Sequence, residues 1–252
     1  MDRAEVQTEL VSAYQRWKAT FDANALAVED FSPPLLLNLT DSYCVAPLKI
    51  IVYGKETAGW DWTHHLQQTF PDYPNNWSFQ DLRTFRDFLN NDDAIEGLVW
   101  GYEQFAFAKS QPQNFRSPFW QAFREIQKWQ DVGVMWANLI RVDYKGRSIF
   151  DADGKERQAM LRQQNKVLRD ELMVLRPTAC IFLTGPDEYD NVLKAAFPQL
   201  EFKQIDDTPE RELARLVHSD LPPKSYRTYH PNYLRQGQKW GYLEIIRRFP
   251  TQ

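Results

Sequence analysis

The stretch Lys49–Trp60, KIIVYGKETAGW, decides the fold class. Its first half holds three β-branched residues and a tyrosine, an apolar run typical of a strand that is buried on both faces of a parallel sheet. A glycine, a lysine and a glutamate follow at once, so the strand ends in a polar turn. Ligands of open α/β sheets bind outside the carboxyl ends of the strands, which makes Glu56 a candidate site residue.

Helical and strand-like patterns alternate along the rest of the chain. Amphipathic or capped helical patterns cover residues 4–26, 118–129, 155–175, 187–197 and 233–249. Further strand-like runs are VGVMWANLI, TACIFLTG and SYRTYHP, whereas LEFKQI is ambiguous. Alternating strands and helices favour right-handed crossovers. We therefore predict an α/β fold, a three-layer α/β/α sandwich around a four-stranded, mainly parallel central sheet.

Length and composition indicate one globular domain. The 252 residues are 43% hydrophobic and 25% charged, and we expect a single domain with residues 1–45 as an N-terminal helical extension packed on it. No secretory signal or membrane-spanning apolar run is visible, which predicts a soluble cytoplasmic protein. Cys44 and Cys180 lie in apolar contexts without a CxxC pair, so we expect reduced core thiols and no metal.

The overall charge does not favour nucleic acid. A formal charge of −4 provides no general attraction for a phosphate backbone, although a local basic groove is compatible with it. Nine Trp, eleven Tyr and sixteen Phe suit a base-stacking site, and they equally suit a large core. Composition alone favours a role of these aromatic residues in the core over a role in base stacking.

Polar side chains stand at all four predicted strand ends. The end segments are Gly54-Lys55-Glu56, Ala137-Asn138-Leu139, Leu183-Thr184-Gly185 and Tyr229-His230-Pro231. Because parallel strands end at one edge of a sheet, a carboxylate, a carboxamide and an imidazole are expected to converge on one crevice.

The order of these motifs resembles the uracil-DNA glycosylase superfamily. In that family a first strand ends in Gly-x-acid/amide-Pro, a second in asparagine and a third in an apolar run closed by glycine, and a His-Pro loop follows the fourth. Over roughly residues 48–236 the corresponding segments here are YGKETAG, VMWANL, IFLTG and YHPNYL. The resemblance implies the α/β/α fold and hydrolysis of the N-glycosidic bond of a base flipped out of DNA.

The resemblance also implies a role for each matching residue. Glu56 corresponds to the carboxylate that orients and deprotonates water, Asn138 to the amide that reads the base edge, and His230 to the group that supports charge on the base. The other base-binding positions would be Gly54, Lys55, Ala58 and Trp60, with Trp62 as a second stacking candidate. The loop after His-Pro would intercalate through Tyr233 or Leu234, and positive charge for DNA would come from Arg227 and Arg235, with Lys224 and Lys239.

Three positions depart from the family pattern. Thr57 replaces a proline, and Glu56 is longer than the commoner acid, which affects the shape of the turn and the position of the water. Ala58 stands where uracil-specific members have a tyrosine that excludes bulky groups on C5 of the pyrimidine. We therefore expect a uracil-like or larger 5-modified pyrimidine, such as a hydroxymethylated or glucosylated base, in repair or phage defence.

Ordinary structural roles compete with these assignments. Glu56 can cap the following helix, Asn138 can bond neighbouring backbone, and His230 can be a turn residue. The sequence nevertheless favours a monofunctional DNA glycosylase that acts as a monomer without metal or organic cofactor. The alternatives are a non-catalytic binder of modified nucleic acid, a nucleoside or nucleotide hydrolase, and a protein-interaction domain that uses surface tryptophans.

Overall fold

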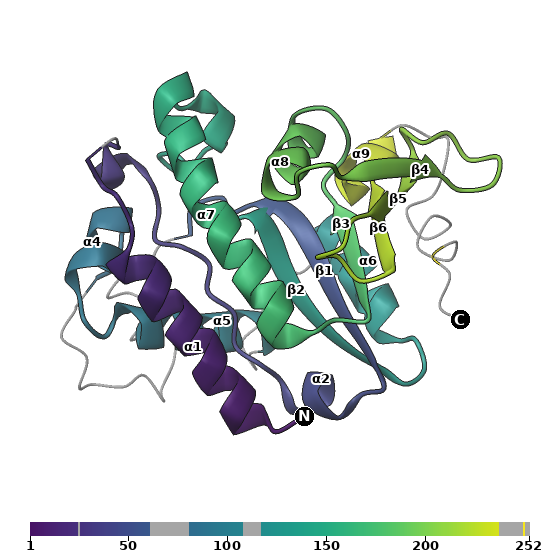
Figure 1. The fold of residues 1–252 in the computed structure, drawn as a ribbon, viewed down its shortest axis with the longest axis horizontal. Coiled ribbons are helices and arrows are strands. Elements are labelled where there is room, and N and C mark those ends of the chain that lie inside the picture. The colour runs from purple at the N-terminus through teal and green to yellow at the C-terminus, as the bar shows by residue number, and fades with distance from the viewer. Residues whose placement is uncertain (25, 61–80, 108–116, 237–248, 250–252) are drawn as a thin grey trace.

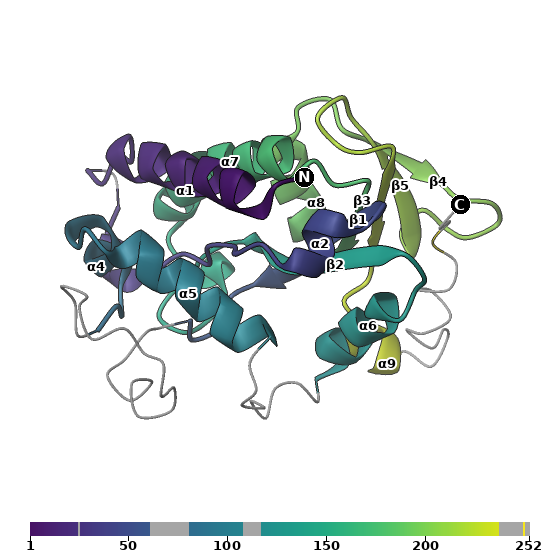
Figure 2. The ribbon, with the colours of Figure 1, turned by 90° about the horizontal axis from the view of Figure 1, so that it is seen from below.

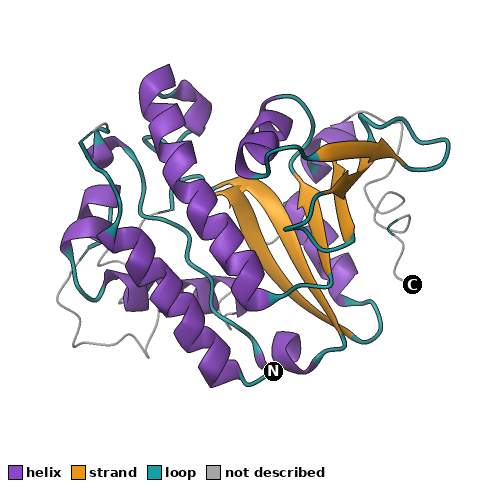
Figure 3. Cartoon of the chain, viewed as in Figure 1, coloured by secondary structure: helices purple, strands orange, loops and turns teal. Residues whose placement is uncertain are grey.

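The computed structural model is α/β, with one six-stranded mixed sheet (Figures 1 and 3). It describes residues 1–24, 26–60, 81–107, 117–236 and 249. The strands are β1 (Leu48–Glu56), β2 (Val132–Ile140), β3 (Ala179–Leu183), β4 (Glu201–Gln204), β5 (Leu213–Val217) and β6 (Lys224–Thr228), in the order β2-β1-β3-β6-β5-β4. Strands β2, β1, β3 and β6 are mutually parallel. Strand β5 is antiparallel to β6, and β4 is antiparallel to β5.

The four parallel strands are the four that the sequence predicts, but the expected total of four strands is wrong. The short β5, LARLV, follows a charged stretch and alternates buried and exposed positions only in part. The outermost β4, EFKQ, is mostly exposed, so it lacks an apolar run. Strand β5 pairs with β6 and β4 pairs with β5, and no local pattern reveals this pairing.

Helices cover both faces of the sheet (Figure 2). One face carries α1 (Arg3–Ala19), α7 (Gly154–Leu175) and α8 (Glu188–Ala196); the other carries α5 (Ala94–Phe107), α6 (Pro118–Gln127) and α9 (Pro231–Gln236). The remaining described helices are α2 (Asp41–Val45), α4 (Phe85–Asn90) and the 3-10 turns η1 (Val28–Asp30) and η3 (Ile149–Asp151). The two helical layers bury the central strands, which explains the continuous apolar run of β1.

The predicted helix starts and stops are largely confirmed. Ser117 caps α6 by accepting from the Trp120 amide, and Pro118 occupies the first helical position. Helix α7 covers the range expected for it, as does α8. Helix α1 ends at Ala19, before the expected residue 26. Of the closing helix, the structure describes only α9 and the single residue Phe249.

The N-terminal segment joins the core of the sheet. The Tyr14 hydroxyl on α1 donates to Oε1 of Glu171 on α7 at 2.8 Å, and Glu171 pairs in the interior with Arg141, which follows β2. An extended stretch then runs beside the residues after β2, where the Ser32 amide donates to the Asp143 carbonyl. The first 45 residues therefore share the hydrophobic core of the sheet.

Other features of the interior bear on the earlier expectations. Cys44 and Cys180 are buried free thiols, and burial raises the pKa of Cys180. Within the described ranges no helix is long and apolar enough to cross a bilayer. The same residues contain no cluster of three or more His, Cys, Asp or Glu side chains suited to a metal ion.

Candidate functional site

A cavity of about 320 Å³ lies at the carboxyl ends of β1 and β2. All seven residues expected at the catalytic and base-binding positions line it: Gly54, Lys55, Glu56, Ala58, Trp60, Asn138 and His230. It is also lined by six residues that the sequence reading did not assign to these positions: Thr57, Gly59, Ser117, Phe119, Trp120 and Trp136. The predicted convergence of the carboxylate, the carboxamide and the imidazole is thus present in the fold.

Glycine at position 54 lets two groups approach the β1 backbone. Gly54 and Asn138 are register partners on adjacent strands. A Cβ atom at position 54 would lie 2.5 Å from Oδ1 of Asn138 and 3.2 Å from the Phe119 ring. Any larger residue would therefore displace the amide or the ring, so glycine defines this wall of the cavity.

Aromatic rings from α6 and β2 form much of the wall. Trp136 precedes Asn138 by two positions, so both side chains lie on the same face of β2. The ring centroids of Trp120 and Trp136 are 5.1 Å apart, and those of Trp60 and Trp136 are 6.4 Å apart. The Ser117-Pro118 helix start was the available signal for the α6 residues, but it could not show which face of the helix meets the strand ends. Trp62 lies outside the described residues.

Three hydrogen-bond donors hold the Glu56 carboxylate. Oε1 accepts from the Ser148 hydroxyl at 2.8 Å and from the Tyr189 hydroxyl at 2.7 Å. Oε2 accepts from the Ile149 amide at 2.8 Å. A carboxylate has about four acceptor positions, so one position on Oε2 is left by these bonds. Glu56 does act as a cap, but of the distant turn η3 and not of a helix that directly follows it.

His230 is placed as a neutral hydrogen-bond donor. Its ring is nearly parallel to that of Phe119, with centroids 6.3 Å apart. Its Nδ1 accepts from the Asn232 amide at 3.2 Å. Burial and the charge of Lys55 lower the pKa of His230 from 6.5 to about 4. The imidazole is therefore uncharged at neutral pH, and because Nδ1 accepts, Nε2 carries the proton.

Lys55 adds a positive charge to the cavity. Its Nζ lies 5.2 Å from the centroid of the Tyr189 ring. Tyr189 is also the residue whose hydroxyl donates to Glu56. The side chain is half-buried. The site thus combines an ammonium, a carboxylate, a neutral imidazole and a carboxamide.

Two of the residues expected to contact DNA are buried. Arg227 is 1% exposed, because its guanidinium pairs with Asp190 at 3.0 Å and donates to the Arg211 carbonyl. Leu234 is 7% exposed, because α9 is helical and neighbouring residues on a helix point in different directions. Neither side chain can reach DNA as placed, which corrects both assignments.

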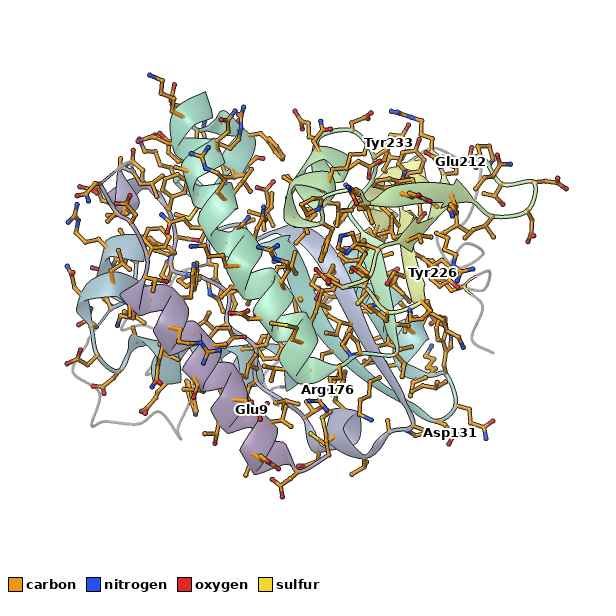
Figure 4. All side chains as sticks on the ribbon, in the orientation of Figure 1. Glu9, Asp131, Arg176, Glu212, Tyr226 and Tyr233 are labelled. Atoms are coloured by element: carbon orange, nitrogen blue, oxygen red, sulfur yellow. The ribbon has the colours of Figure 1, made fainter. Side chains whose placement is uncertain are left out.

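Tyr233 alone among the described intercalation candidates is exposed, at 58%, and its ring stacks on Tyr229 with centroids 4.6 Å apart. Figure 4 shows it at the end of the sheet opposite Asp131 and Arg176, which precede β2 and β3. Lys224 begins β6 and so lies toward that opposite end. The side chain of Arg235 and all of Lys239 fall outside what the structure describes.

A larger hollow of about 550 Å³ lies between α7 and α8. It is lined by residues such as Leu161, Arg162 and Val192, and by none of the strand-end residues. The smaller cavity is the better candidate because the convergent polar groups lie there.

Searches against models of known protein families and against curated proteins find no match to this chain.

Proposed function

We propose that this chain is a monofunctional DNA glycosylase that hydrolyses the N-glycosidic bond of a flipped-out uracil-like or bulky 5-modified pyrimidine. The observation that carries the proposal is the meeting of Glu56, Asn138 and neutral His230 in one aromatic-walled cavity. Hydrolysis requires only water as a second reactant, so the mechanism calls for no metal or organic cofactor.

The base would be bound on the side of Asn138 and His230. Breaking the glycosidic bond leaves negative charge on the departing base, and donors fixed before the reaction stabilise that charge. The Asn138 amide can donate and accept at once, so it can bind a pyrimidine edge. The Nε2 proton of His230 can donate to a carbonyl oxygen of the base. Loss of one such donor typically costs about 3 kcal/mol of transition-state stabilisation.

The sugar would lie toward Glu56. Its negative charge stabilises the positive charge that develops on the sugar as the base departs. The remaining acceptor position on Oε2 suits one water molecule, which would be oriented for attack on the sugar carbon. Because Ser148, Ile149 and Tyr189 fix the carboxylate, little reorganisation would be needed during the reaction.

The loop after Glu56 supports a substrate with a substituent on C5. Ala58 is exposed, and a Cβ atom added at Gly59 would meet no atom of the described residues within 4 Å. Space at these two positions favours a hydroxymethylated or glucosylated pyrimidine over strict selection for uracil. Such a substrate suits a role in repair or in defence against phage DNA.

Duplex DNA would be engaged at the edge where Tyr233 is exposed. An exposed aromatic ring three positions after His230, which lines the cavity, can fill the space that an extruded base leaves. With Arg227 buried, the described positive charge nearest the cavity is that of Lys55. A monomer that acts on DNA in the cytoplasm remains our working expectation.

One observation favours a non-catalytic binder of modified nucleic acid as a second candidate. Three of the acceptor positions of Glu56 are occupied by protein donors, as in a purely structural carboxylate. Such a protein would bind DNA with preference for a modified base and release none. A nucleoside or nucleotide hydrolase would instead turn over the free compounds.

Mass spectrometry of released bases tests the proposal. Duplex and single-stranded DNA carrying uracil, 5-hydroxymethylated pyrimidines or glucosylated 5-hydroxymethylcytosine would be incubated with wild type, Glu56→Ala and His230→Ala. Glu188→Ala, which removes an exposed carboxylate outside the cavity, is the matched control. We expect release of at least one base by wild type and the control, and loss of release in both cavity variants. Absence of release from every DNA would refute the glycosylase.

A further inference from the structure

Tyr189, in the first turn of α8, contacts both charged side chains of the candidate site. Its hydroxyl donates to Oε1 of Glu56 at 2.7 Å, and its ring face lies 5.2 Å from Nζ of Lys55. We propose that Tyr189, together with Ser148, is a positioning residue that fixes the Glu56 carboxylate for attack by water. This inference rests on the proposed glycosylase function.

The surroundings of Tyr189 hold its hydroxyl in place. The residue is 7% exposed, and its ring packs edge-on against Phe150, with centroids 5.3 Å apart. Burial and the negative charge of Glu56 both raise the pKa of Tyr189. The hydroxyl therefore stays protonated at neutral pH and donates to the carboxylate throughout the working range.

The division of donors between the two oxygens gives the carboxylate one orientation. Ser148 and Tyr189 both donate to Oε1, whereas among the described residues Oε2 accepts only from the Ile149 amide. The terminal torsion of a glutamate is broad and nearly two-fold, so it is set mainly by such partners. With Oε1 filled, the acceptor position left on Oε2 defines a single place for water.

Removal of the Tyr189 hydroxyl should separate chemistry from substrate binding. Tyr189→Phe keeps the ring that contacts Lys55 and packs on Phe150, and it frees one acceptor position on Oε1. The carboxylate then loses a donor that holds it in the productive orientation, so it can rotate to an orientation in which its water does not face the sugar. The number of productive complexes falls, whereas contacts to the base stay the same.

The protein offers a closely matched control in Tyr14. Its hydroxyl donates to Oε1 of Glu171 at 2.8 Å, also a buried tyrosine-to-glutamate bond, but neither residue lines the cavity. Tyr14→Phe therefore removes a bond of the same chemistry and nearly the same length, together with the bond that the Tyr14 hydroxyl accepts from the Leu37 amide at 2.9 Å. It should lower stability and leave kcat unchanged.

Steady-state excision of the base found to be released by wild type provides the test. We expect Tyr189→Phe and Ser148→Ala each to lower kcat roughly 10- to 100-fold, the cost of a lost hydrogen bond to a charged group, with KM changed less than 2-fold. The double variant should approach the loss seen in Glu56→Ala, and Ser148→Thr, which keeps a hydroxyl, should recover most of the wild-type kcat. Circular dichroism would establish that each variant is folded.

Several results would overturn the inference. A wild-type kcat in folded Tyr189→Phe, or an equal loss of kcat in Tyr14→Phe, would show that the Tyr189 bond is only structural. A change confined to KM would place Tyr189 in substrate binding. If the wild type itself releases no base, the proposed function and this inference fail together, and that outcome is distinct from failure of the variants alone.

Discussion

Protonation of His230 should weaken the fold in a pH range where most carboxylates are still ionised. Burial and Lys55 lower its pKa from 6.5 to about 4 in the folded chain. Between pH 6.5 and pH 4 the unfolded chain binds more protons than the folded chain does. The contribution of neutral His230 to stability is therefore complete above pH 6.5 and is lost as the pH falls toward 4. From pH 7.5 to 5.5 these two pKa values correspond to a loss of about 1 kcal/mol in the free energy of unfolding.

Urea unfolding of wild type and His230→Asn at both pH values measures this loss. The asparagine Oδ1 can replace Nδ1 as acceptor for the Asn232 amide and does not titrate. Contributions from all other groups cancel in the difference between the two proteins. We expect the advantage of wild type over the variant to shrink by about 1 kcal/mol between pH 7.5 and 5.5. An equal difference at both pH values would show that the folded imidazole titrates normally, and the neutral-donor role would then lose its basis.

Three further predictions follow from the cavity wall. Ala58→Tyr should abolish release of a bulky 5-modified base and preserve release of uracil in the mass-spectrometric assay. Unchanged activity on the bulky base would show that the space at position 58 does not receive the substituent on C5. Gly54→Ala should displace the Asn138 amide, because its Cβ would lie 2.5 Å from Oδ1, and lower kcat/KM roughly 10-fold or more; wild-type kcat/KM would mean that Asn138 does not bind the base. Thr57→Val should raise the free energy of unfolding by about 1 kcal/mol, because the hydroxyl of Thr57 has no hydrogen-bond partner among the described residues and the residue is only 4% exposed. A loss of stability in urea unfolding would show that the hydroxyl has a partner.

Local patterns predicted the parts of the fold that are locally determined. Apolar runs closed by glycine or polar residues identify β1, β2 and β3, and the short segment SYRTYHP identifies β6. The shared direction of these four strands brings Glu56, Asn138 and His230 to one edge. Strand β5 was missed and the segment that contains β4 stayed ambiguous, because their places depend on the pairing of β5 with β6 and of β4 with β5 and not on apolar runs of their own.

Contacts between distant residues could not be predicted in the same way. Glu56 is separated from Ser148 by 92 positions and from Tyr189 by 133, so nothing near KETAG indicates these donors to its carboxylate. Arg227 illustrates the opposite error. Arginine usually indicates an exposed charge, but a partner 37 positions earlier, Asp190, allows this one to be buried.

The hydrogen bond between Tyr14 and Glu171 has a consequence for folding during synthesis. These residues are 157 positions apart. At the usual rate of about 5 to 20 residues per second, the ribosome takes about 8 to 30 s to make the chain between them. Tyr14 therefore leaves the ribosome long before its partner exists. Until then α1 has an apolar face without its final cover, and this interval is when a chaperone would have most to contribute.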